Sequence, residues 1–495
     1  MAASKSKTSR HTEVERKFDV SESTVSPSFE GLSAVTRVDR ASTQHLEAVY
    51  FDTPGHDLAA HRVTLRRRTG GSDAGWHLKL PAGQDTRTEV RAPLDDGVDG
   101  AVPEELKDVV LAIVRDRPLG PVAQITTERT VDVLYGADGT PIAEFSDDQV
   151  TASAGDGDPQ RWREWELELA EGASASDDVL DRLANRLLDA GAAPAGHGSK
   201  LARVLADSDG DEAQQTAADP IHRAVAEQVD LLVEWDRSVR ADVYDSVHQM
   251  RVTTRKIRSL LQASEGAFGI SDDAWVLDEL RQLASVLGVA RDAEVLAERY
   301  EKALDDLPDE LVRGPIRKRL VEGAKRRYQS GLRRSLIAMR SQRYFRLLDA
   351  LDGLVAAEPA TKAVGDEPAT ATIDSAYKRV RKAAKNAASA GTEDRDEALH
   401  RIRKGAKRLR YTAAATGADK VSDRAKVIQT LLGDHQDSVV SRTHLGQQAD
   451  AAHAAGEDTF TYGLLYAHED AVAREARLQL DSALKKLDKS VRKAR

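Results

Sequence analysis

The sequence has no cysteine, and this absence excludes disulfide bonds, thiolate metal ligands and a cysteine nucleophile. It also lacks any run of about 18 apolar residues, the length that a membrane-spanning helix needs. The polar start MAASKSKTSR is not followed by an apolar stretch, so we predict neither a membrane span nor a secretory signal and expect a cytoplasmic protein. At 40% hydrophobic residues the chain is too apolar to be disordered throughout, and 495 residues suffice for several domains.

The charges divide unevenly along the chain. Residues 1–220 hold 24 basic and 40 acidic side chains, whereas the remainder holds 48 basic and 42 acidic ones. The two parts meet in the polar run ADSDGDEAQQTAADP at residues 206–220, which has no large apolar residue and cannot contribute to a core. We therefore predict a disordered tail at residues 1–11, an acidic domain at 12–205, a linker at 206–219 and a basic domain at 220–495.

Short segments of alternating apolar and polar residues fill the acidic domain, for example VTLRRR, WHLKL and REWELELA. Gly, Pro and Asp separate these segments, which is typical of antiparallel strands joined by turns. Helical spacing occurs chiefly at Glu104 to Arg115 and at Asp177 to Leu188. The pattern predicts an α+β domain built on an antiparallel sheet.

Charged residues share one face of these strands. In the first strand, alternation places Glu13, Glu15 and Lys17 together; acids recur in the last strand and bases occupy the strands between. If only one strand had this pattern, its charged face would usually be explained by exposure to solvent. A closed sheet with this pattern would instead place a carboxylate wall opposite a cationic wall. Because divalent cations prefer carboxylate oxygens and Arg and Lys neutralise phosphate, the interior suits a phosphate chain with Mg²⁺ or Mn²⁺.

Five motifs follow one another in this domain: Glu-x-Glu-x-Lys at residues 13–17, YFDTP at 50–54, LRRR at 65–68, WHLKLP at 76–81 and ELEL at 166–169. In this order they resemble the CYTH family of triphosphate tunnel metalloenzymes over about residues 12–205. The resemblance implies an eight-stranded antiparallel tunnel that hydrolyses a triphosphate with divalent metals and without a covalent intermediate. The family also includes adenylate cyclases and thiamine triphosphatases, so the substrate stays open.

The CYTH resemblance also implies roles for individual residues. It makes Glu13, Glu15 and Lys17 catalytic. The triphosphate-binding residues that it implies are Lys17, Arg66, Arg68, Lys79, Arg91, Arg129 and Lys200. The implied metal ligands are Glu13, Glu15, Glu166, Glu168 and Asp148. The pattern leaves open which late-strand acid faces the metal. It also does not decide between Asp148 and its neighbour Asp147.

The basic domain has apolar residues at helical spacing from Ile221 to the C-terminus, interrupted by a polar run at residues 358–372. Residues 247–259 (VHQMRVTTRKIRS) match residues 399–411 (LHRIRKGAKRLRY) at an offset of 152, and LGVARDAEV at 287–295 matches LGDHQDSVV at 432–440. Two matches in the same order indicate an internal duplication. We predict an all-α domain of two four-helix bundles, at about residues 220–357 and 373–495.

Each repeat carries a basic stripe on one helix face. The first stripe is His248, Arg251, Arg255 and Arg258, and the second stripe is His400, Arg403, Lys407 and Arg410. Acids are almost absent from these segments, and from Leu311 to Leu348, so a bound polyanion would relieve the repulsion between like charges. The stripes carry few aromatic residues for base stacking and no recognised base-reading motif, which leaves nucleic acid only backbone contacts. The two histidines are either ligand contacts or structural residues.

The duplicated stripes and LGxxxDxxV segments resemble the CHAD domain family over about residues 220–495. The resemblance implies two four-helix bundles around a basic channel that binds inorganic polyphosphate through the stripe residues. We interpret Asp292 and Asp437 of the LGxxxD segments as helix-capping or salt-bridging residues.

The combined prediction is a metal-dependent hydrolase of inorganic triphosphate or short polyphosphate, joined to a helical polyphosphate binder and located in the cytoplasm or on polyphosphate granules. A non-enzymatic hypothesis is that both domains only bind polyphosphate and target the protein to granules. Two further hypotheses are that the tunnel acts as an adenylate cyclase or as a thiamine triphosphatase. We expect no membrane and no specific nucleic acid as partners, and the sequence does not indicate an oligomeric state.

Overall fold

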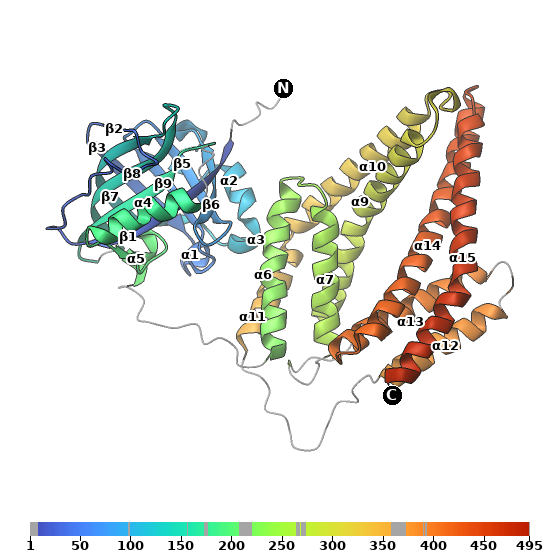
Figure 1. The fold of residues 1–495 in the computed structure, drawn as a ribbon. Helices are drawn as coiled ribbons and strands as arrows, with labels where there is room; N and C mark the ends of the chain where they lie inside the picture. Colours follow the sequence, from blue (N-terminus) through green and yellow to red (C-terminus); the bar gives the residue numbers. More distant parts are fainter. Residues whose placement is uncertain are drawn as a thin grey trace, which may run out of the picture. The chain divides into compact units, whose positions relative to one another are not determined.

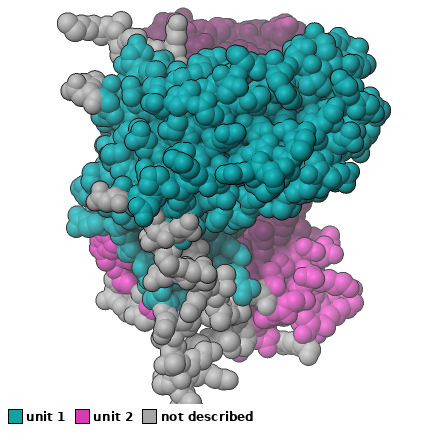
Figure 2. Space-filling view, turned by 90° about the vertical axis from the view of Figure 1, so that its left-hand side faces the viewer, with its two compact units in different colours: residues 1–260, 336–358 teal, residues 261–335, 359–495 magenta. Residues whose placement is uncertain are grey.

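The computed structural model describes residues 8–97, 100–155, 157–172, 177–206, 220–263, 268, 274–357, 373–389, 391 and 394–494. Most of the expected tail, the linker and the second polar run lie outside these residues. The chain forms two compact units, coloured teal and magenta in Figure 2. Unit 1 comprises Met1–Leu260 and Leu336–Glu358, and unit 2 comprises Leu261–Ser335 and Pro359–Arg495. Unit 1 thus holds helices from the basic half of the chain, and the expected division of that half at residues 357 and 373 stays a prediction.

The acidic domain is a closed antiparallel barrel (Figure 1). Its strands are β1 (Ser9–Val20), β3 (Gln44–Asp52), β4 (Thr64–Thr69), β5 (Gly75–Pro81), β6 (Thr86–Ala92), β7 (Gly120–Tyr135), β8 (Pro141–Ala154) and β9 (Gln160–Leu169). They pair in the order β1-β6-β5-β4-β3-β7-β8-β9, and β9 pairs again with β1. Two short strands lie off this ring: β2 (Arg37–Arg40) pairs with β7, and β10 (Ala193–Pro194) pairs with β1. The predicted eight-stranded tunnel is confirmed.

The apolar core of the barrel lies outside it, beneath short helices. Trp76 and Leu78 of β5 pack against residues of α2 (Glu104–Val109) and α3 (Leu111–Val114). Phe145 and Trp165 pack against α4 (Asp177–Asp189), and α5 (Lys200–Ala206) covers a third patch around Ile125. Because successive side chains alternate between faces, covering the outer face with apolar residues leaves the inner face to the charged ones.

The basic half is helical, as predicted. Its helices in unit 1 are α6 (Pro220–Arg240), most of α7 (Ser246–Ala263) and α11 (Gln342–Ala356). Unit 2 contains α9 (Trp275–Asp305), most of α10 (Ile316–Met339), α12 (Ile373–Ala388), α13 (Arg395–Ala415), α14 (Asp419–Ala454) and α15 (Phe460–Ala494). Among the residues searched, no helix combines the length and the low polarity that crossing a bilayer would require.

The duplication is visible in which residues α7 and α13 bury. On α13, Leu399, Ile402, Ala406 and Leu409 are buried, and each directly precedes one residue of the second stripe. On α7 the corresponding buried residues are Val247, Met250, Thr254 and Ile257, and each directly precedes one residue of the first stripe. Both stripes therefore run along the border of a buried helix face, where long basic side chains keep their charged ends near solvent.

Two expectations about the basic half are wrong in part. Asp292 and Asp437 lie in the interiors of α9 and α14, so neither caps a helix end. The bases of α10 are also not free of acids, because α9 and the connection between α14 and α15 supply partners that local sequence does not reveal. The ion pairs are Arg317 with Asp305, Arg319 with Glu457, and Lys325 with Glu301, and Glu322 of α10 itself pairs with Arg326.

Candidate active site in the tunnel

One cavity in the barrel collects most of the predicted site residues. Its lining includes eleven of them, namely Glu13, Glu15, Lys17, Arg66, Arg68, Lys79, Arg91, Arg129, Glu166, Glu168 and Lys200. The residues that the sequence reasoning did not select are Tyr50, Thr64, Asp73, Arg87, Glu89, Gly198 and Ser199. Alternation does place Glu89 on one face with Arg91, although it assigns Glu89 no role, and the same alternation could have found Arg87 on the inward face of β6.

The order of strands separates the charges in the cavity. Because β9 pairs with β1, the acids Glu166 and Glu168 lie beside Glu13 and Glu15, whereas β4, β5 and β7 contribute bases and β6 contributes both Glu89 and two arginines. Glu168 lies opposite Glu15, and Glu166 lies opposite Lys17, in the register of the closing pair. Strand alternation thus produces the predicted carboxylate wall, with one lysine set within it.

Lys17 bridges two carboxylates of this wall. Its Nζ donates to Oε2 of Glu15 at 2.8 Å and to Oε1 of Glu166 at 2.7 Å. Against the opposing effect of burial, Lys17 and then Lys79 lower the pKa of Glu15 to about 2, and Glu15 in turn raises the pKa of Lys17. Both groups are therefore ionised at neutral pH.

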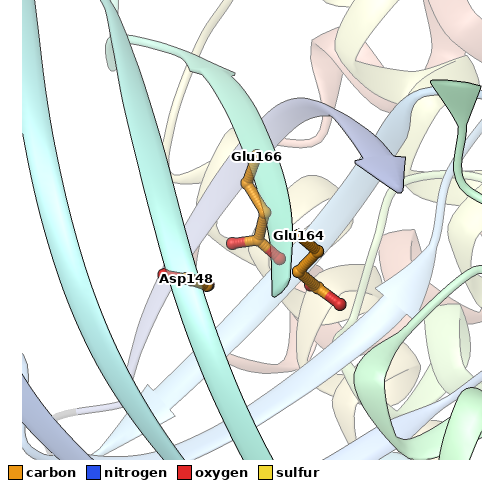
Figure 3. Close-up of side chains that lie close together, drawn as sticks. All are labelled: Asp148, Glu164 and Glu166. Atoms are coloured by element: carbon orange, nitrogen blue, oxygen red, sulfur yellow. The ribbon is translucent and has the colours of Figure 1, made fainter. Parts of the chain in front are cut away.

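A second group of acids surrounds Lys200 at the start of α5. Figure 3 shows Asp148 on β8 beside Glu164 and Glu166 on β9, and their nearest oxygens lie within 4.8 Å of one another. Lys200 Nζ lies 2.9, 2.6 and 2.8 Å from oxygens of these three residues in that order. Arg129 adds bonds to Asp148 and Glu166. Because two cationic side chains already neutralise this cluster, it is a poorer metal site than its geometry alone indicates.

The choice between neighbouring aspartates is clear in the structure. Asp148 is fully buried and contacts Arg129 and Lys200, although it does not itself line the cavity. Asp147 lies on the other face of β8, where Arg163 and Ser26 bind its carboxylate. Asp148 therefore belongs with the tunnel acids, while Asp147 anchors the loop after β1.

Glu13, Glu15 and Glu168 form a further group of carboxylates that could hold a divalent cation, although Lys79 Nζ lies 2.6 Å from Oε2 of Glu13 and Lys17 donates to Glu15. Burial, and after it the charges of Glu13 and Glu15, raises the pKa of Glu168 to about 7 despite the opposing effect of Lys79. Within the described part of the chain, the carboxylate of Glu168 makes no hydrogen bond or ion pair. A half-buried acid that lacks a partner and faces two further acids is an oxygen-rich environment suited to Mg²⁺ or Mn²⁺. These residues could hold such an ion at the carboxylate wall.

The opposite wall has an excess of positive charge. Burial, then Arg66 and Arg129, lowers the pKa of Arg68 to about 9. The buried Nε atoms of Arg66 and Arg68 have no hydrogen-bond partner among the described residues. Arg66 donates to the hydroxyl of Tyr50 at 3.2 Å, and Arg68 pairs with Asp73. Guanidinium groups that repel one another and retain unused N–H donors are suited to a multiply charged anion.

The motif YFDTP divides between the tunnel and its support. Tyr50 lines the cavity, whereas Asp52 is fully buried and accepts backbone N–H bonds from Thr53 at 2.7 Å and from Leu58 and Ala59 at 2.9 Å. These bonds hold the short helix α1 (Asp57–Ala60) against the end of β3. Asp52 is therefore a structural residue, although it belongs to a motif of the tunnel family.

The second stripe lies along α13 beside the LGxxxD segment of α14. Gly433 provides space for Arg403, because a Cβ at that position would lie 3.4 Å from its Nη2. Burial raises the pKa of Asp437 against the opposing charges of Arg403 and Arg299, so this aspartate lies near bases, and its interpretation as a salt-bridging residue stays a prediction. The first stripe belongs to unit 1 and the second to unit 2, and a shared channel stays a prediction.

Comparisons with known proteins match a CYTH domain at residues 11–187 and a CHAD domain at residues 223–446. Uncharacterized proteins MT2285 and Rv2226 of two Mycobacterium tuberculosis strains are each 68% identical over 505 residues, covering 98% of either chain. Among solved structures, PptA from Streptomyces chartreusis is 19% identical, with a TM-score of 0.43, covering 54% of this chain and 98% of its own. The CHAD domain from the plant Ricinus communis is 21% identical, with a TM-score of 0.40, covering 54% of this chain and 90% of its own. The chain belongs to the family of proteins in which a CYTH domain is followed by a CHAD domain.

Proposed function

We propose that the tunnel hydrolyses inorganic tripolyphosphate or short polyphosphate and that the helical domain binds longer polyphosphate. The cavity lining carries the proposal for the tunnel, since eight of its 18 residues are basic and six are acidic. Tyr50 is the one aromatic residue in this lining, and its hydroxyl is bound by Arg66. A nucleobase or thiamine ring would have little apolar surface to bind, whereas a bare phosphate chain would meet charged groups along its whole length.

Hydrolysis requires a water oxygen to attack one phosphorus atom while a bridging P–O bond breaks. Arg66, Arg68 and Arg129 supply N–H donors for the phosphate oxygens and so orient the chain along the cationic wall. Lys17, fixed between Glu15 and Glu166, places a positive charge near the carboxylate wall and limits repulsion between acids and substrate. A divalent cation held by Glu13, Glu15 and Glu168 would neutralise phosphate charge and lower the pKa of a bound water.

The test is an assay of phosphate release from tripolyphosphate, thiamine triphosphate and ATP with Mg²⁺ or Mn²⁺. We expect tripolyphosphate to have the highest kcat/KM, and Glu15→Gln to lower turnover by about two orders of magnitude or more. Glu128→Gln is a matched control, because Glu128 precedes Arg129 on β7 and its side chain is 50% exposed on the opposite face. Circular dichroism establishes that each variant is folded, and bound-metal content shows whether Glu15→Gln has lost the cation.

Three results would favour the other functions. Cyclic nucleotide and pyrophosphate formed from ATP would indicate a cyclase, and a preference for thiamine triphosphate would indicate a thiamine triphosphatase. Absence of hydrolysis with every divalent cation, combined with binding of polyphosphate, would indicate a binding or granule-targeting protein. A turnover in Glu15→Gln equal to that of the parent would contradict the assignment of Glu15 to the active site.

A further inference from the structure

Arg115 joins the barrel domain to the helical half of the chain within unit 1. Its side chain is 5% exposed, and it donates through Nη1 to Asp349 and through Nη2 to Asp352, both on α11. The residue also adopts a φ of 59°, a backbone conformation that residues other than glycine rarely adopt. A buried guanidinium whose two carboxylate partners both come from α11 would lose them if that helix moved away.

Asp108 of α2 makes a second connection to the same helices. Its carboxylate accepts bonds from Arg240, at 3.0 Å, and from Arg340, at 2.9 Å. Arg240 is the last residue of α6, and Arg340 lies between α10 and α11. One carboxylate of the barrel domain therefore holds the end of one helix and the start of another.

Arg240 is fixed on its other sides as well. Its side chain is 2% exposed and contacts the fully buried Asp236 and the carbonyl oxygen of Met339. Tyr344 of α11 donates to the same Asp236 at 2.9 Å. Val233 of α6 packs against the apolar cluster that contains Trp76 and Leu78 of the barrel. Apolar and ionic contacts together make this an ordered joint between α6, α11 and the barrel domain.

The joint determines where the first stripe lies. After Arg240, a short turn in which Asp242 and Asp245 both have a positive φ leads directly into α7. α7 carries His248, Arg251, Arg255 and Arg258, and all four belong to unit 1 with the barrel. A fixed end of α6 and a tightly turned connection leave the stripe little freedom relative to the tunnel.

We propose that Asp108 and Arg115 clamp α6 and α11 onto the barrel domain, so that the first stripe delivers long polyanions to the tunnel from a fixed position. The linker at residues 206–219 then serves as a covalent connection, and the clamp sets the geometry. The dependence of turnover on the clamp rests on the proposed function, but the clamp itself does not.

The first experiment measures the joint without activity. The absence of native cysteine allows spin labels at Asn185→Cys on α4 and Ser259→Cys on α7, two exposed positions within unit 1. We expect one narrow distance distribution in the parent. In Asp349→Asn/Asp352→Asn the distribution should become about twofold wider, because Arg115 has lost both anionic partners. Asp108→Asn tests the second connection independently. Equal widths in all three proteins would overturn the clamp.

The second experiment measures kcat/KM for long polyphosphate relative to tripolyphosphate in the same full-length proteins. We expect about a fivefold fall in this ratio for Asp349→Asn/Asp352→Asn, with tripolyphosphate turnover retained, because the tunnel binds the short chain unaided. Asp349→Glu/Asp352→Glu should restore the ratio, and Arg346→Gln, an exposed change on the same helix, should not alter it. A wider distribution with an unchanged ratio would overturn delivery by the stripe. If the parent hydrolyses no substrate, the proposed function fails while the distance measurement still decides the clamp.

Discussion

Lys17 on β1 lies opposite Glu166 on β9, and its Nζ donates to the Oε1 of that glutamate at 2.7 Å. These residues are 149 positions apart in the sequence, and they meet because β9 closes the barrel against β1. The strand pair that completes the fold therefore also completes the carboxylate wall.

Replacing this lysine should affect substrate binding more than folding. We expect Lys17→Met to raise the KM for tripolyphosphate by about tenfold or more, since a charge-assisted hydrogen bond contributes roughly 1.5–3 kcal/mol. Steady-state kinetics at saturating metal would measure the effect. Arg16→Met is the control on the opposite face of β1, where the guanidinium binds Asp85 and Asp181. A KM equal to that of the parent would contradict a substrate-binding role for Lys17.

Replacing Asp52, in contrast, should affect folding more than catalysis, because its role is structural. Asp52→Ala removes the acceptor of three buried N–H groups, so the free energy of unfolding of the barrel should fall by about 2 kcal/mol. Urea unfolding followed by tryptophan fluorescence would measure this loss. The kcat/KM of the folded fraction should not change, because Asp52 does not line the cavity. Unchanged stability with lost activity would show that Asp52 acts in the site.

Much of the barrel and its site could be predicted because strand alternation is a local signal. The alternation of side chains between the two faces of a strand places Glu13, Glu15 and Lys17 together, and it groups Glu164 with Glu166 and Glu168. The helix expected at Glu104 to Arg115 is instead divided at Val110 into α2 and α3, and the short strands β2 and β10 have too few residues for a periodic pattern.

Contacts between distant elements could not be predicted in this way. Arg115 and Asp349 are 234 residues apart, and nothing near either one indicates its partner. The ion pairs of α10 could not be predicted for the same reason, since their acids lie on α9 and in the connection between α14 and α15. Lys200 entered the predicted site through family resemblance, because it lies at the start of a helix and belongs to no inward-facing strand pattern.

We expect the affinity of the second stripe for polyphosphate to depend on the salt concentration. For long polyphosphate without metal, the logarithm of the binding constant should fall linearly with the logarithm of the salt concentration. Arg403→Gln/Lys407→Gln should reduce this slope by about 0.7 for each charge removed, if polyphosphate resembles a single-stranded nucleic acid. Lys404→Gln/Arg408→Gln removes the same charge from exposed positions off the stripe and should have a smaller effect on affinity. Equal losses of affinity in both pairs would mean that the stripe has no special role.

His444 predicts a pH dependence of stability in unit 2. Burial, and after it the charge of Arg327, lowers the pKa of its ring to about 4. Arg327 donates to Nε2 at 2.6 Å, which leaves Nδ1–H to donate to Tyr300 at 2.8 Å, so the folded protein holds the neutral ring. The unfolded chain takes up a proton near pH 6.5. As the pH falls from about 6.5 to about 4, folding should therefore lose about 3 kcal/mol through this residue.

The variant His444→Gln should remove that part of the pH dependence, because a glutamine amide can make both hydrogen bonds but does not ionise in this range. Unfolding free energies of parent and variant between pH 7 and pH 4 would measure the difference. His453→Gln, at an exposed position on the same helix, should leave the pH dependence unchanged. Parallel stability curves for the parent and His444→Gln would contradict the neutral ring.

The closing of the barrel by β9 also has a consequence for biosynthesis. During translation, β1 leaves the ribosome first, and its closing partner follows only after the other six strands of the ring have been made. Until then the edge of β1 that pairs with β9 has unpaired backbone groups next to four charged side chains, which discourage pairing with another chain. The joint with α11 forms later still, because Asp349 and Asp352 are synthesised more than 200 residues after Arg115. A nascent chain can therefore complete its tunnel well before the helices that fix the first stripe are available.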